Sequence, residues 1–329
     1  MFLTRYLHLV EPPPERDGRE GVLQPPLAIF VFGEVHGVIT GKKEVVVSIK
    51  NARQRKLLAF LATVARELKV DWEFIVNKIY DTKDGKDPAA LRKLLDDDIK
   101  AIRDAFKAAF VKAGLPYVNP IFVDGKGDNV PKRLADPYQV VDLNSPEEIA
   151  QQVVRVKREG PGGIRAVRGV YSEVLQSVAQ GFIGRQVRDI NADLIDSWET
   201  EYVERYHQKY VRLLQDCTEC EGALGERLSG EEQRVCYWQA AHLYKQLAFE
   251  QRPVELVRVN SQSLATLSEH ALRQSMKFFG RLNDVLAIEQ TFSEYRNKMR
   301  QISSDWQANN QTLELIHEIV KDVSVEKAS

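Results

Sequence analysis

Cysteine and histidine side chains are the first candidates for chemistry in this sequence, because they are the usual ligands of zinc. Cys217 and Cys220 lie three residues apart, and Cys236 and His242 follow downstream. A structural zinc site needs four such ligands in a tetrahedron. A separation of three also places two thiols on one face of a helix, where small buried cysteines are common. We favour buried thiols and expect no metal.

Motifs for covalent catalysis and for nucleotide binding do not occur in the sequence. The six histidines are scattered, and none accompanies a nucleophile motif such as GxSxG. The phosphate-binding pattern GxxxxGK[ST] is also missing. The loop Gly160–Gly163 is too short for that role and has no lysine, so we interpret it as a hinge between helices. We therefore expect no enzyme activity, no catalytic residues and no cofactor.

Charged side chains within residues 87–113 fit a different chemistry, the recognition of DNA. On a helical wheel, apolar residues occupy one arc of this segment and ionisable residues occupy the opposite arc. Lys and Arg can reach phosphates and guanine, and Asp can accept a hydrogen bond from the cytosine amino group. Our candidates for base-edge contacts are Lys93, Asp96, Asp97 and Lys100. Our candidates for phosphate contacts are Arg53, Arg55, Arg92, Arg103, Lys126, Lys132 and Arg133.

Consecutive aspartates argue against this interpretation. Asp96 and Asp97 would repel phosphates unless they meet base edges, and Asp98 lies near the apolar arc. A charged outer face on an amphipathic helix is also usually just solvated. From the residues alone, both DNA binding and a plain protein-interaction role stay open.

The elements that must position these side chains form the pattern of a winged helix-turn-helix. β-Branched segments on both sides of the turn Thr40–Lys43 predict a small antiparallel sheet. Three helices follow, with Asn51, Asp71 and Asp87 as their predicted N-caps. The third helix has proline at its first position and runs to Ala113, where a glycine follows.

Two further strands complete the front module. Residues 121–123 and 138–141 are predicted strands on either side of a polar loop, which holds Lys126, Lys132 and Arg133. In a winged helix-turn-helix the third helix enters the major groove, and the hairpin can place cations along the adjacent backbone. The order of sheet, three helices and hairpin therefore predicts an α+β DNA-binding module.

Residues after Asn144 show helical patterns without strand signals. We expect an all-α module of about seven helices, paired in hairpins of the TPR-like kind. The expected fold is thus an α+β winged helix-turn-helix followed by an all-α helical-hairpin domain. The predicted domains are a flexible leader at 1–27, the winged helix-turn-helix domain at 28–143, the all-α domain at 144–324 and a tail at 325–329.

Composition excludes several classes of protein. Apolar residues make up 43% of the 329 residues and charged residues 28%, which is ordinary for globular proteins and unlike a disordered chain. No apolar run approaches the ~18 residues of a membrane span, and no signal peptide is evident. Three cysteines fit a reducing compartment. We therefore expect a cytoplasmic protein with no membrane partner.

Charge is distributed unevenly along the chain, although the net charge is only −1. Residues 1–140 contain 23 basic and 19 acidic side chains, whereas residues 141–329 contain 23 basic and 28 acidic ones. A mildly basic front and an acidic back indicate two modules with different partners.

The front module resembles a known family. IFVFGEVHGVITGKKEVVV, followed by ARQRKLLAFLATVARE, resembles the opening of the OmpR-type winged-helix domain in SARP-type bacterial transcriptional regulators. VDWEFIVNKIYD is similar to the second helix of that domain, and DPAALRKLLDDDIKAIRDAF to its recognition helix. This recognition helix is more acidic than the family pattern, and the wing loop is longer.

The back module resembles the bacterial transcriptional activation domain that follows in these regulators. The matching segments are YSEVLQSVAQGFI, Asp196-Ser197-Trp198, Glu204-Arg205 and HALRQSMKFFGRLNDVLAIEQTFSEYR, which turns at Gly280-Arg281. The resemblance covers about residues 28–324. It implies double-stranded promoter DNA, RNA polymerase or a sigma factor, and a second copy on repeated half-sites as partners, with nucleoid association in the bound state.

The leading hypothesis is a sequence-specific transcriptional regulator that activates by recruitment. The rival hypothesis is a protein-interaction adaptor whose winged helix no longer binds DNA. A third possibility is a regulator that senses a ligand in its helical module, although no residue pattern identifies that ligand.

Overall fold

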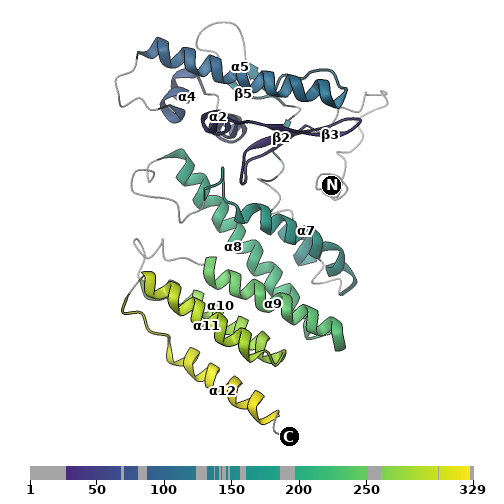
Figure 1. Cartoon of the computed structure of the whole chain (residues 1–329), viewed down its shortest axis with the longest axis vertical. Helices are drawn as coiled ribbons and strands as arrows, with labels where there is room; N and C mark the ends of the chain where they lie inside the picture. Colours follow the sequence, from purple (N-terminus) through teal and green to yellow (C-terminus); the bar gives the residue numbers. More distant parts are fainter. Residues whose placement is uncertain are drawn as a thin grey trace. The chain divides into compact units, whose positions relative to one another are not determined.

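The protein is described by a computed structural model, and its contacts divide the chain into two compact units (Figure 1). The first unit comprises residues 1–145 and 176–207, and the second comprises 146–175 and 208–329. Within these units the structure describes residues 27–67, 70–80, 87–123, 132–136, 138–140, 142, 146, 149–155, 161–185, 197–250, 261–302 and 304–326.

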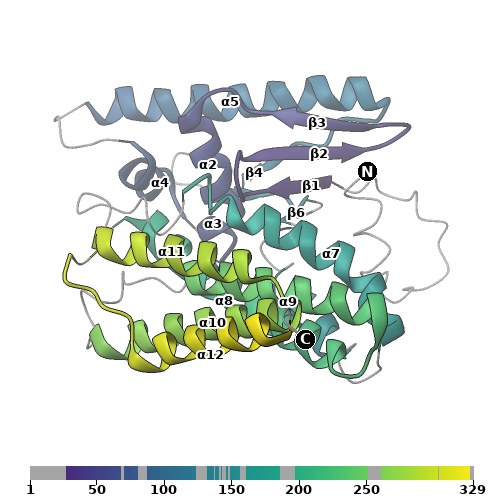
Figure 2. The same cartoon turned by 60° about the horizontal axis from the view of Figure 1, so that its bottom comes forward.

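A small sheet opens the first unit and confirms the predicted strands near its start. Strands β1 (Leu27–Phe30), β2 (His36–Thr40) and β3 (Glu44–Ser48) pair antiparallel in the order β3-β2-β1. Strand β6 (Tyr138–Val140) joins the other side of β1 in a parallel pairing, as Figure 2 shows. The sheet therefore combines the start of the unit with a segment more than 90 residues downstream.

Helices of the first unit begin where the sequence predicts. Helix α2 (Ala52–Ala62) is capped by Asn51, and α3 (Val64–Glu67) continues it after a break at Thr63. The other helices are α4 (Trp72–Ile79), capped by Asp71, and α5 (Pro88–Ala113), capped by Asp87 and ended by Gly114. In each cap a side-chain oxygen accepts a hydrogen bond from a backbone N–H of the first turn.

The predicted hairpin between residues 121–123 and 138–141 is wrong. Strand β4 (Ile121–Val123) instead pairs antiparallel with β5 (Lys132–Leu134), so Lys132 and Arg133 lie on a strand. Tyr138 is buried against Phe106, and its hydroxyl donates to the Val118 carbonyl at 2.7 Å. A hairpin of residues 121–123 with 138–141 would have closed a shorter loop. The burial of Tyr138 and its neighbours beside β1 outweighs that advantage.

The described residues 176–185 and 197–207 pack within the first unit. The Gly33 N–H donates to the Gly181 carbonyl at 2.9 Å, and the Ile183 N–H donates to the Val31 carbonyl at 2.7 Å. Aromatic rings add contacts, because Phe182 stacks on Tyr206 and packs edge-on against Phe32. Phe182 and Tyr206 therefore belong to the first unit's core, while the division into functional domains at residues 143 and 144 stays a prediction.

The described part of the second unit is built from helices, as the periodicity predicts. Its helical residues include 149–155 and helices α7 (Pro161–Ala179), α8 (Trp198–Gly225), α9 (Gly230–Glu250), α10 (Ser261–Arg281), α11 (Val285–Ile302) and α12 (Asn310–Glu326). Two of these helices are shared between the units. The end of α7, from residue 176, and the start of α8, up to residue 207, are assigned to the first unit. The TPR-like pairing stays a prediction.

The predicted hinge at Gly160–Gly163 is wrong over residues 161–163, which begin α7. Proline is tolerated in the first turn of a helix, because its missing N–H has no partner there in any case. The predicted break at Arg252-Pro253 lies outside the described residues. Among the helices that the structure describes, none has the length and apolar character needed to cross a membrane.

Candidate nucleic-acid interface

Helix α5 separates an apolar face from a charged face. Its buried residues face the sheet and helices α2 and α4. The predicted base-contact residues Lys93, Asp96, Asp97 and Lys100 are all exposed. The buried residues are Leu91, Leu95, Asp98, Ile99, Ile102, Phe106, Ala109, Phe110 and Ala113. The apolar and charged arcs of the helical wheel are thus confirmed, whereas contact with bases stays a prediction.

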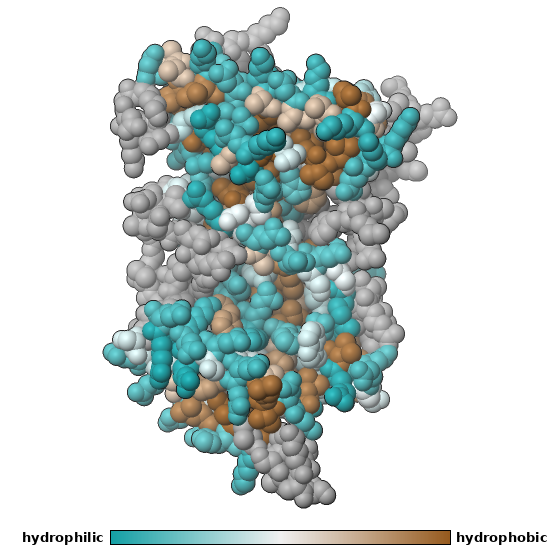
Figure 3. Space-filling view, in the orientation of Figure 1, coloured by the Kyte–Doolittle hydropathy of each residue, from teal (hydrophilic) through white to brown (hydrophobic). Residues whose placement is uncertain are grey.

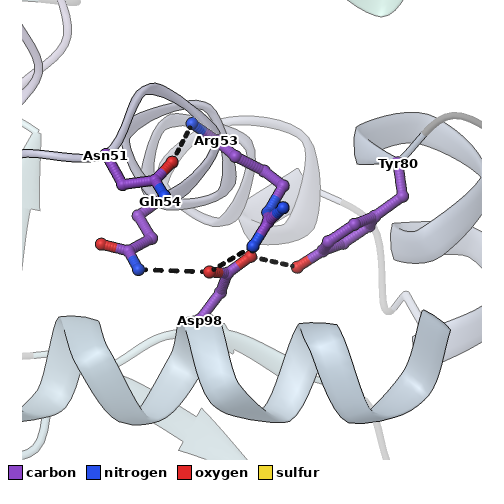
Figure 4. Close-up of polar contacts among 5 residues, drawn as sticks. All are labelled: Asn51, Arg53, Gln54, Tyr80 and Asp98. Carbon is purple, nitrogen blue, oxygen red and sulfur yellow. Dashed lines mark hydrogen bonds and ion pairs between the residues drawn. The ribbon is translucent and has the colours of Figure 1, made fainter. Parts of the chain in front are cut away.

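Asp98 differs from its two neighbours because it points into the protein (Figure 4). Its carboxylate accepts hydrogen bonds from Arg53 Nε at 2.6 Å and from Arg53 Nη2 at 3.1 Å. The Tyr80 hydroxyl donates to it at 2.8 Å, and the Gln54 amide donates at 3.2 Å. One carboxylate therefore joins α2, the end of α4 and α5, and it does not add negative charge to the outer face.

The ionisation of this cluster follows from its burial and its hydrogen bonds. Burial alone would raise the pKa of Asp98, but the hydrogen bonds from Arg53, Tyr80 and Gln54 outweigh it and lower that pKa. Burial and the bond to Asp98 raise the pKa of Tyr80. The hydrogen bond to Asp98 raises the pKa of Arg53. The cluster is thus an ionised pair with a neutral tyrosine at ordinary pH.

Two predicted phosphate-contact residues on α2 are bound to protein groups. Arg53 is held by Asp98 and lies over the Tyr80 ring at 5.4 Å. Arg55 donates from Nη1 to the carbonyls of Ile49 and Lys50, each at 2.9 Å. Arg53 binds a carboxylate 45 residues away, and Arg55 binds backbone carbonyls. No residue pattern in the sequence indicates either contact.

Two more predicted cations are bound by protein groups at or near strands β4 and β5. Arg103 donates from Nε to the Asn119 side chain at 3.1 Å and from Nη2 to the Ile121 carbonyl at 3.4 Å. Arg133 forms a two-pronged pair with Asp136, one bond of which measures 3.1 Å. Both guanidiniums are therefore oriented by neighbours near strands β4 and β5.

Strand β5 brings several predicted residues together. The Lys132 N–H donates to the Val70 carbonyl at 3.1 Å, which ties β5 to the segment before α4. Burial lowers the pKa of Lys132, while Asp96 acts to raise it, Arg92 and Arg103 act to lower it, and Asp71 acts to raise it. Arg92, Asp96, Arg103 and Lys132 thus share one electrostatic environment on the described surface, whereas Lys126 lies outside the described residues. We call these four residues the junction cluster.

Trp72 is a residue of this region to which the sequence analysis above assigned no role. The Arg92 guanidinium lies over its ring, 5.4 Å from the centroid. Trp72 is the first residue of α4, and its position is held by the Asp71 cap. The contact between Arg92 and Trp72 could not be predicted from the sequence, because the two residues lie on different helices.

The surface of the first unit is mostly polar around this region. Figure 3 shows hydrophilic side chains over α5, with hydrophobic ones among them and over β2 and β3. Exposed apolar residues here include Val46, Phe74, Val111 and Tyr117. Single exposed apolar side chains are normal on folded proteins, so the polar character of α5 is the more informative feature.

Metal-ligating residues do not gather in the described part of the chain, where no group of three His, Cys, Asp or Glu side chains could hold an ion. Cys217, Cys220 and Cys236 are all buried as free thiols. Glu221 is fully buried beside them and is bound by Arg168 through Nε at 2.7 Å and Nη2 at 2.6 Å. This ion pair has a structural role between α7 and α8.

Comparisons with known proteins do not assign a family. No family model matches the chain, and no curated protein matches it. Among solved structures the chain is similar to "Mycobacterium tuberculosis EmbR in complex with low affinity phosphopeptide", with 11% identity and a TM-score of 0.41. That match covers 91% of this chain but 66% of the other, so the chain spans less than two thirds of that protein. Such a loose overlap supports no conclusion, and the proposals below rest on the residues themselves.

Proposed function

We propose that the chain is a transcriptional regulator that binds duplex DNA through a winged helix-turn-helix in its first unit. The junction cluster is the observation that supports this best. Cations from α5 and β5 gather there, and Lys93 and Lys100 are exposed on the same helix α5. Cations that repel one another are stabilised when an anion such as a phosphate lies between them.

The inward orientation of Asp98 supports the same proposal. Three consecutive aspartates on a groove-reading helix would repel the DNA backbone. Because Asp98 is bound to Arg53 inside the protein, its charge is already compensated. Asp96 and Asp97 then remain on the outer face, where a carboxylate can accept from a cytosine amino group.

Family resemblance extends this proposal to the whole chain. By its resemblance to SARP-type regulators, the first unit would be of the OmpR type and the helical unit a bacterial transcriptional activation domain. That domain would contact RNA polymerase or a sigma factor, and a second copy of the chain would occupy an adjacent half-site. The protein would then be cytoplasmic and associated with the nucleoid when bound.

Selection of duplexes from a random library, followed by a salt series, tests DNA binding directly. We expect an enriched sequence and an affinity that falls steeply as salt rises, because phosphate contacts release counterions. Lys100→Ala should weaken specific binding by ~1–3 kcal/mol if Lys100 reads a base. Lys112→Ala, in the last turn of the same helix, is the matched control and should change little. No binding of any duplex at low salt would contradict the proposal.

A protein-interaction adaptor is the second candidate, and one observation favours it. Arg53, Arg55 and Arg133, three of the cations that we assigned to phosphates, are bound to acceptors within the protein. A winged helix that had lost DNA binding would show such pairing. The low-salt experiment separates the two candidates, since an adaptor would not bind random duplex DNA.

A further inference from the structure

We propose that Arg92 reads a guanine in the major groove and that Trp72 positions it for this contact. Sequence analysis assigned Arg92 to a phosphate. The new assignment rests on the proposed function. It adds which side chain recognises a base, and which base that is, at one position of the operator.

The position of Arg92 over the Trp72 ring is the first argument. Its guanidinium lies 5.4 Å from the centroid of the Trp72 ring. Both side chains are half-buried, so the contact is at the surface and is partly shielded from water. A guanidinium over an aromatic face gains cation–π attraction and loses rotational freedom before any ligand arrives.

The rigidity of the platform is the second argument. Trp72 starts α4 directly after its cap, where the Asp71 carboxylate accepts from the Phe74 N–H at 2.8 Å. Arg92 lies in the second turn of α5, next to the buried Leu91. Both backbones are therefore fixed by local hydrogen bonds and by core packing, so the Arg92 guanidinium and the Trp72 ring meet on two well-anchored helices.

Restricting where a guanidinium lies matters more for bases than for phosphates. Guanine presents O6 and N7 side by side, and a guanidinium must lie in the base plane to donate to both. A phosphate offers oxygens in many directions, so a mobile point charge such as lysine serves equally well. Preorganisation of Arg92 by Trp72 is thus useful for reading a guanine and adds little to a backbone contact.

Neighbouring residues can supply the phosphate contacts. Lys132 on β5 and Arg103 on α5 lie in the same electrostatic environment as Arg92. Arg103 is oriented by Asn119 at 3.1 Å. With Arg103 on the same helix and Lys132 on β5 available for backbone contacts, Arg92 is not required for neutralisation of the DNA backbone.

The test compares selected sequences and random-duplex affinity for the wild-type chain and Arg92→Lys. Lysine keeps the positive charge but lacks the planar fork. We expect Arg92→Lys to lose a preference for guanine at one operator position, roughly tenfold or more. Its affinity for random duplex and the slope of affinity with salt should match those of the wild type, because the number of phosphate contacts is unchanged.

Further variants separate positioning from structure. Trp72→Leu should lose part of the same guanine preference, and Trp72→Phe, which keeps an aromatic face, should restore most of it. Arg133→Lys is the control for a phosphate contact and should select the wild-type sequence. Thermal unfolding of each variant establishes that it is folded.

Three outcomes would overturn the inference. The first is an identical selected sequence for the wild type and Arg92→Lys. The second is an equal loss of affinity on all sequences, which would make Arg92 a phosphate contact. The third is a wild-type chain that binds no duplex at low salt, which would overturn the proposed function as well and is therefore distinguishable from the other two.

Discussion

Arg53 on α2 and Asp98 on α5 are joined by two parallel hydrogen bonds, at 2.6 Å and 3.1 Å. This two-pronged geometry is the strongest that the two groups can form. Because the Asp98 side chain is only 3% exposed, the pair sets how α5 is rotated about its own axis. The rotation keeps Lys93 and Lys100 on the outer face.

Removal of this carboxylate should destabilise the first unit. Asp98→Ala leaves the Tyr80 hydroxyl and the Arg53 guanidinium without their acceptor, at a cost of about 2–3 kcal/mol. The cost stays below that of a fully buried pair because Arg53 is 40% exposed and can be partly hydrated. Urea unfolding measures it. Asp97→Ala, one residue earlier and exposed, should stay within about 0.5 kcal/mol of wild type, and equal losses in both variants would contradict this role.

Two glycines should respond in opposite directions to replacement by alanine. A Cβ at Gly37 would lie 2.6 Å from Cζ of the buried Phe106, so Gly37→Ala should destabilise by about 1–3 kcal/mol. A Cβ at Gly169, within helix α7, meets nothing within 4 Å. Gly169→Ala should therefore stabilise by about 0.5–1 kcal/mol through helix propensity. Thermal unfolding would contradict this packing if both variants shifted in the same direction.

Glu199 should matter far more than its exposed neighbour Glu201. Glu199 is buried and forms ion pairs with Lys56 and, at 3.1 Å, with Arg185. Glu199→Ala should cost about 2–3 kcal/mol, because it leaves two partly buried cations without their partner. Glu201→Ala is the matched control and should be near neutral. A Glu199→Ala protein with the wild-type urea midpoint would refute the buried position of this carboxylate.

The stability of the first unit should depend on pH through Asp142. Burial raises the pKa of Asp142 from 3.8 to about 7, although the N–H groups of Phe32 and Val31, each donating at 2.7 Å, act to lower it. The folded state therefore holds a proton that the unfolded state releases. This contribution is full below pH 3.8 and is lost as the pH rises to about 7.

The comparison that isolates this group is wild type against Asp142→Asn, which does not titrate. The difference in free energy of unfolding should fall by up to about 1.4 kcal/mol per pH unit across that window and level off above it. Urea unfolding at a series of pH values measures the difference. A difference that is independent of pH would show that Asp142 is already ionised in the folded protein.

Helix boundaries were predictable because their signals are local. Asn51, Asp71 and Asp87 bind N–H groups two or three residues away, so the capping residue and its partner are read together in sequence. The alternation of buried and exposed residues along α5 follows from the 3.6-residue period in the same way.

Strand pairing was not predictable from the same information. Residues 121–123 and 138–140 both have strand character, and local spacing favoured their pairing with each other. The structure pairs the first with Lys132–Leu134 and the second with Leu27–Ile29. Strand character is a property of a segment, whereas the partner depends on which apolar faces can be buried together.

The sequence by itself determined where the helices begin and which face of α5 is charged, because capping and periodicity act over a few residues. Only the tertiary structure decided which charges on that face are available to a partner. Asp98 and Arg53 are 45 residues apart, and their pairing exists only when α2 packs on α5. Packing of α4 on α5 places Arg92 against Trp72, and strand β5 brings Lys132 near Arg103. Tertiary contacts thus decide which charged side chains are bound within the protein and which are brought together on its surface.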